Sequence, residues 1–367
     1  MPHRFPAILA LGLTLLSAAS GRAAHAQLIF SDGYETGLLS SLHYVVAWQN
    51  DQSDANATQI KARGFEGRFP ELTANAYFPG TQINPAVAIA ADGSFVVAWQ
   101  EDGDGNGLFQ VWARGFHADG SERFPPITVN SVSAGQQKNP DIAMSPNGDF
   151  VVVWEDDQDG NGLSNILGRG FYANGTQRFS DRDVAYSGPG AERAPVVGMA
   201  DDGSFVVAWS DDQDYNGFFQ IAARGFNANG SQKFSARTVN TAGAGQQIQP
   251  DIAVAPNGDF VVAWADDQGN DWFFQVLARG FFANGSERFS DITLNQIGTA
   301  SQYRPSVGIL ADGRFAAAWV DQDYRVSGRR FDTLGNPETG DIVLMSTDMT
   351  GLGAQMPPSA PRLRSSA

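Results

Sequence analysis

Three acidic stretches of the chain have the residue types and spacing of a calcium-binding loop. They read DGDGNG from Asp102, DQDGNG from Asp157 and DQDYNG from Asp212. Calcium prefers oxygen ligands, and oxygens at alternate positions of a short loop closed by glycine can surround the ion. The predicted ligands are Asp102, Asp104, Asn106, Asp157, Asp159, Asn161, Asp212, Asp214 and Asn216.

A fourth stretch, DQGND, keeps two of these acidic positions in register, Asp267 and Asp271. Because calcium takes roughly six to eight oxygens, backbone carbonyls, water or a neighbouring loop would have to complete each site. The alternative interpretation is structural, since Asp, Asn and Gly are ordinary turn residues. No glutamate follows at the spacing of an EF-hand, so the loops are not that motif.

Aromatic residues follow the acidic stretches, and an arginine recurs after them. Rings at a loop edge can stack on sugars or anchor a protein, and filling gaps between strands is the structural alternative. The rings are Phe109, Phe218, Phe219, Trp272, Phe273 and Phe274.

The recurring arginines are Arg63, Arg114, Arg169, Arg224, Arg279 and Arg329. A desolvated arginine is usually paired, so we expect them to bond backbone carbonyls or acidic residues such as Asp156, Asp211, Asp266 and Asp321.

All of these residues occupy fixed places in a repeated unit. The phrase VVAW, or a close variant, ends at six tryptophans spaced by 51 and then 55 residues: Trp48, Trp99, Trp154, Trp209, Trp264 and Trp319. Each unit contains four short segments with strand-like alternation, joined by the acidic loop and by tight Asp-Gly or Asn-Gly turns. Helical periodicity is absent.

Six such units predict an all-β fold, a six-bladed β-propeller of four-stranded antiparallel blades. Small residues such as Ala88 and Gly198 alternate in the first strand of the units, which suits strands crowded around an axis. A β-solenoid is the alternative, but its rungs are usually much shorter. We predict that the propeller covers residues 44–345. The tail 346–367, with Gln355 and Pro358 in linker register, is predicted to supply the missing inner strand of the first blade.

The first 26 residues have the pattern of a secretory signal peptide. A basic start precedes the apolar run AILALGLTLLSAAS, and small residues at Ala24 and Ala26 predict cleavage after Ala26. A segment of residues 27–43 then leads to the repeats. No later segment is apolar for the about twenty residues that a membrane span needs. We therefore expect a protein that is secreted, periplasmic or on the cell surface.

Composition excludes several classes of function. The chain has no cysteine, which excludes a catalytic thiolate and thiolate-bound zinc. With 24 basic and 40 acidic residues the net charge is -16, which opposes binding of nucleic acid and suits cations or a neutral partner such as a glycan. No phosphate loop, nucleophile elbow or zinc motif is present. Carboxylates are plentiful, so residue types leave a glycosidase open.

The unit resembles a repeat of large bacterial secreted and surface proteins. The resemblance rests on D/N-G-x-F-V-V-x-W, R-G-F-x-A-N-G and V-N-x-x-x-x-G-x-Q, and covers residues from Tyr44 to Met345. It implies association with calcium-binding and adhesion modules and no enzymatic activity. The segment LIFSDGYETG resembles a motif at the mature start of exported proteobacterial proteins.

These observations favour a non-enzymatic binding or adhesion scaffold, a monomer whose partner is an extracellular glycan or protein. The alternatives are a lectin-like propeller and an extracellular glycan hydrolase or lyase. A lectin should repeat its aromatic and polar ligands in several blades, whereas an enzyme should break the symmetry in one place with carboxylates. The acidic loops are nearly symmetric, which favours binding.

Overall fold

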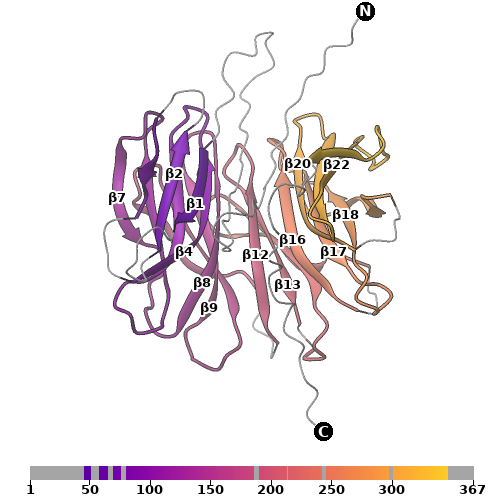
Figure 1. The fold of residues 1–367 in the computed structure, drawn as a ribbon. Coiled ribbons are helices and arrows are strands. Elements are labelled where there is room, and N and C mark those ends of the chain that lie inside the picture. Colours follow the sequence, from indigo (N-terminus) through magenta and orange to yellow (C-terminus); the bar gives the residue numbers. More distant parts are fainter. Residues whose placement is uncertain are drawn as a thin grey trace, which may run out of the picture.

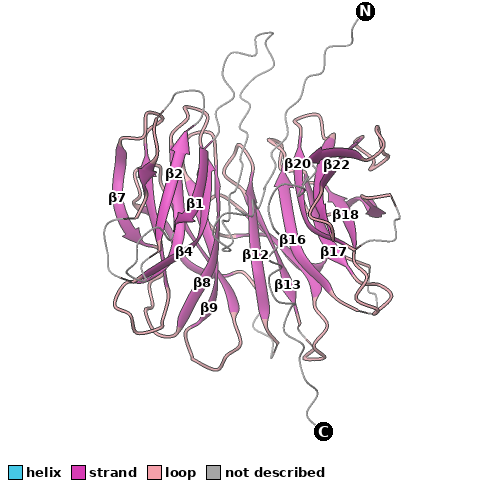
Figure 2. Ribbon diagram, viewed as in Figure 1, coloured by secondary structure: helices cyan, strands magenta, loops and turns pink. Residues whose placement is uncertain are grey.

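The computed structural model of the protein describes residues 45–50, 58–64, 69–75, 80–185, 190–212, 214–241, 245–296 and 301–345. The predicted signal peptide, the segment 27–43 and the tail 346–367 lie outside these residues. The predicted pairing of the tail with the first blade lies outside them as well. All regular secondary structure of the described residues is β-strand (Figure 2). Within them there is no helix long and apolar enough to cross a membrane.

The strands form six antiparallel sheets, which follow one another in sequence order (Figure 1). The first sheet has three described strands, β1 (Val45–Asn50), β2 (Gln59–Gly64) and β3 (Leu72–Thr73). The next two sheets have four strands each: β4 (Thr81–Ile89), β5 (Phe95–Asp102), β6 (Gln110–Phe116) and β7 (Glu122–Thr128), then β8 (Gln136–Met144), β9 (Phe150–Asp157), β10 (Asn165–Phe171) and β11 (Gln177–Asp183).

The remaining three sheets also have four strands each. The fourth contains β12 (Glu192–Met199), β13 (Phe205–Asp211), β14 (Gln220–Phe226) and β15 (Gln232–Thr238). The fifth contains β16 (Gln247–Val254), β17 (Phe260–Asp266), β18 (Gln275–Phe281) and β19 (Glu287–Thr293). The sixth contains β20 (Gln302–Ile309), β21 (Phe315–Asp321), β22 (Val326–Phe331) and β23 (Ile342–Met345). The first strands β4, β8, β12, β16 and β20 are neighbours in this order. The fold is a six-bladed β-propeller, as predicted.

The blades are held together by apolar residues of their second strands. These strands carry VVAW-type sequences in which side chains alternate between the two faces, so each sheet packs against both of its neighbours. Between the third and fourth blades, for example, Val151 and Val153 of β9 pack in one cluster with Val207 and Trp209 of β13. Trp209 is 1% exposed. Five of the six repeated tryptophans lie in such cores between successive blades: Trp99, Trp154, Trp209, Trp264 and Trp319.

Each of the five described inner strands contains a bulge close to its first residues. The bulge residue has a left-handed backbone and precedes a proline at Asn84, Asn139, Ala194, Gln249 and Arg304. A side chain of the preceding blade accepts the exposed N–H at several of these bulges. Gln100 Oε1 lies 2.8 Å from Asn139 N, and Glu155 Oε1 lies 2.8 Å from Ala194 N. The second strand of one blade is thus tied to the inner strand of the next.

The repeated arginines are paired as expected, but with different partners. Arg169 bonds Asp181 of β11, and Arg279 Nε donates to Asp291 Oδ1 of β19 at 2.6 Å. The predicted bonds to backbone carbonyls are confirmed for Arg114, Arg224 and Arg329. The acids that follow the tryptophans were named as the acidic partners, and that part of the prediction is wrong. Those acids lie at the opposite end of the third strand, where Asp266 Oδ2 accepts the Trp264 Nε1–H at 2.8 Å.

Candidate functional site

The acidic loops lie on the face of the propeller that also carries the connections between blades. In the second blade Asp104 Oδ2 accepts the Asn106 Nδ2–H at 2.8 Å, and Asn106 Oδ1 accepts the Leu108 N–H at 2.7 Å. Asp102 Oδ2 accepts the Gly107 N–H at 3.1 Å. The next two loops repeat this pattern with Asp157, Asp159, Asn161, Asp212, Asp214 and Asn216. The structure therefore brings the three predicted ligands of each loop together.

In each loop the carboxylate of the first aspartate accepts the backbone N–H five residues further on, and this bond closes the loop. In the fifth blade Asp267 accepts the N–H groups of Asp271 and Trp272 at 3.0 and 3.1 Å. Among the described residues no three His, Asp or Glu side chains lie close enough together to hold a metal ion. A carboxylate oxygen has further lone pairs beyond those used here. Calcium binding by Asp, Asn and carbonyl oxygens of these loops stays a prediction.

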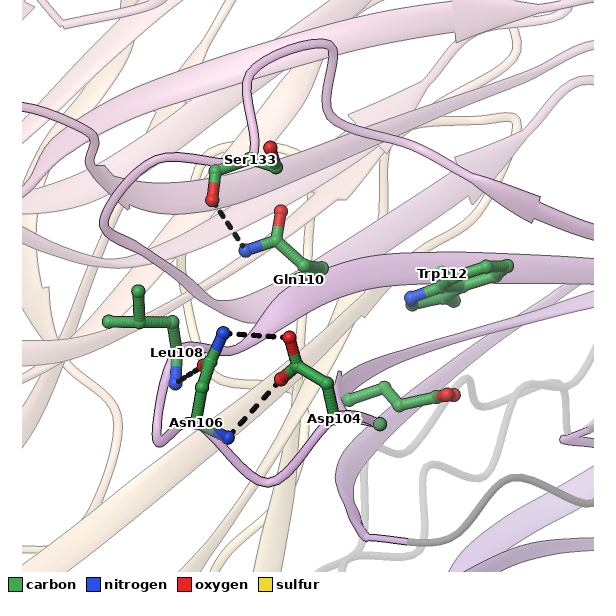
Figure 3. A pocket seen from close by; sticks show the side chains of 8 residues that line it. Asp104, Asn106, Leu108, Gln110, Trp112 and Ser133 are labelled. Carbon is green, nitrogen blue, oxygen red and sulfur yellow. Dashed lines mark hydrogen bonds between the residues drawn. The ribbon is translucent and has the colours of Figure 1, made fainter.

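A pocket of about 350 Å³ lies beside the first acidic loop (Figure 3). Its lining residues are Glu101, Gly103, Asp104, Asn106, Leu108, Gln110, Trp112 and Ser133. Gln110 Nε2 donates to the Ser133 carbonyl at 3.2 Å, as Figure 3 shows. Burial raises the pKa of Glu101, even though the Trp99 Nε1–H donates to it at 2.8 Å. The pocket combines an indole with amide and carboxyl groups, a combination suited to a polar ligand with an apolar face.

Trp112 distinguishes this pocket from the corresponding places in the other blades. The equivalent residues are Lys61, Leu167, Ala222, Leu277 and Ser327. Trp112 is half-buried and packs against the cluster between the first two blades. An aromatic side chain therefore lines this position in the second blade alone.

Three aromatic side chains project from the same face in the fourth, fifth and sixth blades. Tyr215, Trp272 and Tyr324 are 56%, 68% and 57% exposed. All three have a left-handed backbone, with φ of 60°, 65° and 60°. This conformation costs a residue with a side chain roughly 1–2 kcal/mol, and glycine occupies the place of Tyr215 and Trp272 in the second and third blades. Strain of this kind persists only where the surrounding structure imposes it, as at the inner-strand bulges, and functional sites are another such place.

The predicted rings are divided between surface and interior. Trp272 is the most exposed of them, and Phe218 is 36% exposed. Phe274 is buried and packs on Tyr303 with ring centroids 5.4 Å apart. Tyr215 and Tyr324 were not predicted, although Tyr215, in a position that is glycine in the second and third blades, was a signal in the sequence.

A network of amide side chains closes most of the junctions between blades on this face. At the junction of the second and third blades, Asn130 Oδ1 accepts the Val111 N–H at 2.9 Å, and Asn130 Nδ2 donates to Gln110 Oε1 at 2.7 Å. Gln136 Oε1 accepts the Phe109 N–H at 3.2 Å. The junction of the fourth and fifth blades repeats these bonds with Gln220, Asn240, Gln246 and Phe219. The network fixes the connection between consecutive blades.

The junction of the third and fourth blades lacks this network. The residues that replace its phenylalanine, glutamines and asparagine are Ser164, Asn165, Ala185, Ala191 and Glu192. Four of the five are smaller than the residues they replace, and the fifth changes an amide into a carboxyl group. The equivalents of Glu192 in the other blades are Gln82, Gln137, Gln247 and Gln302. The symmetry of the acidic loops does not extend to this junction.

Glu192 is 1% exposed, and neither of its carboxyl oxygens has a hydrogen-bond partner. Burial raises the pKa of Glu192 to about 8, and the nearby Asp211 carboxylate adds to this effect. Asp211 is the cross-strand neighbour of Glu192 on β13. Trp209 Nε1 is buried without a hydrogen-bond partner, whereas Trp99, Trp154 and Trp264 donate to the acid two residues further on. The environment of Glu192 therefore keeps a carboxylic acid neutral at pH 7.

Glu155 of β9 contributes a further carboxyl group to this junction. It is 5% exposed, and its Oε1 accepts the Ala194 N–H of β12 at 2.8 Å. Its equivalents are Gln49, Gln100, Ser210, Ala265 and Val320. At these positions the third and fourth blades thus share three carboxyl groups, of Glu155, Glu192 and Asp211. The junctions of the first with the second blade, the second with the third, the fourth with the fifth and the fifth with the sixth have one each. Sequence reasoning missed Glu192, whose signal is a single Gln-to-Glu change within the repeat.

No protein-family model matches the chain, and no curated protein matches it. Solved structures share the fold at low sequence identity. An α-L-arabinanase of Penicillium chrysogenum complexed with arabinobiose is 10% identical, with a TM-score of 0.50, over 80% of this chain and 91% of that one. An α-L-arabinofuranosidase of glycoside hydrolase family 93 from Fusarium graminearum is 11% identical, with a TM-score of 0.51, over 77% and 86%. A Dyadobacter fermentans protein of unknown function is 12% identical, with a TM-score of 0.50, over 76% and 87%.

Proposed function

We propose that the protein is a secreted, monomeric carbohydrate-binding propeller that holds glycan on the face with the acidic loops. The observation that carries this proposal is the set of exposed rings of Tyr215, Trp272 and Tyr324, each with a left-handed backbone. A flat aromatic ring beside polar groups suits a sugar, which presents C–H groups on its faces and hydroxyls at its edges. The rings project from three consecutive blades, so one extended glycan could contact more than one of them.

The charge of the chain supports a neutral ligand. A net charge of -16 disfavours anionic partners. The pocket beside Trp112 adds polar groups of Asp104, Asn106 and Gln110 to the same face. The names of the two enzymes of similar fold, an arabinanase and an arabinofuranosidase, indicate that those enzymes act on glycans. Calcium bound at the acidic loops would stiffen this face. The role that we propose for the protein is adhesion through surface glycans.

The test compares two exposed aromatic side chains on opposite faces. Trp272 lies in a loop between second and third strands, whereas Phe282, 45% exposed, lies in a turn between third and fourth strands. Affinity electrophoresis through gels containing linear arabinan, xylan, mannan or β-glucan should show retardation of the wild-type protein by at least one polysaccharide. Trp272→Ala should weaken that binding about tenfold, since an aromatic contact contributes about 1 kcal/mol. Phe282→Ala should bind as the wild type does. No retardation, or equal losses in both variants, would refute the proposal.

A further inference from the structure

We propose that the pocket of the second blade binds one or two sugar units of a neutral glycan, with Glu101 accepting a hydroxyl group and Trp112 packing on a sugar ring. This inference rests on the proposed binding of glycan to the same face. It goes beyond that proposal, because it assigns a recognition site to one blade of an otherwise repetitive scaffold and states the size and charge of its ligand.

Three of the residues that line the pocket differ from their equivalents in the other blades. One is Trp112, the only aromatic residue at its position in the repeat. The second is Glu101, whose equivalents are Asn50, Asp156, Asp211, Asp266 and Asp321. The third is Gly103, and the first, third, fourth and fifth blades have glutamine in its place, at Gln52, Gln158, Gln213 and Gln268. The three differences meet in one pocket, and the other blades fold without them.

Gly103 leaves space beside the carboxyl group of Glu101. Gly105 and Gly107 of the same loop have φ of 69° and 83°, a conformation that favours glycine. The φ of Gly103 lies outside this left-handed region, so its backbone accepts a residue with a side chain. A Cβ atom at Gly103 would lie 2.9 Å from Glu101 Oε1. The glutamine that four other blades carry would therefore crowd this part of the pocket, and glycine keeps it open.

Glu101 presents a carboxyl oxygen to this space. It is 3% exposed and lines the pocket. Trp99 Nε1 donates to its Oε2 at 2.8 Å, and Asp156 and Asp266 accept the equivalent tryptophan N–H in their blades. Within the described part of the chain this is the hydrogen bond that the carboxyl group of Glu101 accepts, so Oε1 remains for a ligand. Since a buried polar atom without a partner costs free energy, a ligand hydroxyl that donates to Oε1 would stabilise the complex.

The other lining residues indicate the class of ligand. Leu108 adds apolar surface to that of Trp112. Asp104, Asn106 and Gln110 add polar groups (Figure 3), and such a mixture suits the apolar faces and hydroxyl edges of a sugar. The lining has two carboxyl groups and no basic side chain among the described residues, which opposes a sugar that carries a carboxylate. The volume of about 350 Å³ lies near the lower end of the roughly 300–1,000 Å³ of small-molecule sites, so we expect one or two neutral sugar units.

The test is isothermal titration calorimetry of the full chain with arabinobiose, xylobiose, mannobiose and cellobiose, and with digalacturonic acid as the acidic probe. The wild-type protein should bind at least one neutral disaccharide and not the acidic one. Glu101→Asp and Gly103→Gln should each weaken that binding at least about tenfold, because the first withdraws a charged hydrogen-bond acceptor and the second fills the space beside it. Both variants introduce residues that other blades carry, so circular dichroism should show the wild-type fold.

A second measurement tests contact of the ligand with Trp112. Binding of the disaccharide should change the tryptophan fluorescence of the wild type. Trp112→Leu introduces the leucine of the third and fifth blades and should remove most of this change. The matched control is Gln158→Gly, the reverse of Gly103→Gln in the third blade, and it should bind the disaccharide as the wild type does.

The outcomes separate this inference from the proposed function. Absence of binding to every neutral disaccharide, wild-type affinity in Glu101→Asp and Gly103→Gln, an unchanged fluorescence response in Trp112→Leu, or equal binding of digalacturonic acid overturns the present proposal. Retardation by a polysaccharide that Trp272→Ala weakens then leaves the proposed function intact. Disaccharide binding that the pocket variants weaken, without retardation by any polysaccharide, supports the pocket and refutes the role of the exposed rings.

Discussion

Replacing Glu192 by glutamine should make the protein more stable at alkaline pH and leave it almost unchanged at pH 5. The substitution keeps the shape of the side chain and removes a buried group that can ionise. Glutamine occupies the equivalent position in the other blades, at Gln137 for example, whose Nε2 donates to the Ala134 carbonyl at 2.7 Å. The variant should therefore fold as the wild type does.

The sign follows from the two states of the protein. The folded form keeps the proton of Glu192 up to a pKa of about 8, whereas the unfolded chain releases it near the ordinary value of 4.5. The folded state binds more protons between these values, so the free energy of unfolding falls as the pH rises through this window. The stabilising contribution of protonated Glu192 is present at low pH and is lost above about 8.

The magnitude follows from the size of the pKa change. An increase from 4.5 to about 8 would correspond to roughly 5 kcal/mol if it were expressed in full. Water near the junction and relaxation of neighbouring side chains reduce effects of this kind. We therefore expect Glu192→Gln to exceed the wild type by about 2–3 kcal/mol at pH 8.5, and by less than about 1 kcal/mol at pH 5.

Urea denaturation of both proteins between pH 5 and pH 9, followed by tryptophan fluorescence, measures this difference. Other groups with raised pKa values, such as Asp251 at about 6, are common to both proteins and cancel. The reverse change in another blade, Gln137→Glu, should lower stability at pH 8.5. Parallel stability curves for the wild type and Glu192→Gln would refute the reasoning, because they would mean that Glu192 titrates like an exposed carboxyl.

Two further predictions concern the loops of the same face. Millimolar calcium should raise the melting temperature relative to a chelator, because an ion bound to the folded state alone stabilises it, and Asp159→Ala should reduce the increase. Equal melting temperatures with no heat of binding would show that the acidic loops are only turns. Trp272→Gly should raise the free energy of unfolding by about 1 kcal/mol, because glycine adopts a φ of 65° without strain. The same variant should lose glycan retardation, and a lower melting temperature would show that the Trp272 ring contributes to packing.

Much of the fold was determined by local features of the sequence. The six VVAW phrases alternate between two faces, and the Asp-Gly and Asn-Gly turns fix short hairpins, so strands and blades follow from neighbours along the chain. That the repeated arginines have bonding partners was also predictable, because a charged side chain buried in a sheet must be paired. Their identity was not, because the fourth strand brings Asp181 and Asp291 alongside Arg169 and Arg279.

Only the tertiary structure decided which residues form the candidate site. Glu155, Glu192 and Asp211 are distant in the sequence, and packing of the third blade on the fourth brings them to one junction. The sequence contained the substitution of glutamine by Glu192, but the pKa of that group depends on removal of water, which is a property of the packed interface rather than of the residue. Exposure of Tyr215 likewise depends on the left-handed turn that the loop adopts. Repeated patterns determine the scaffold, whereas the chemistry depends on where the folded repeats differ.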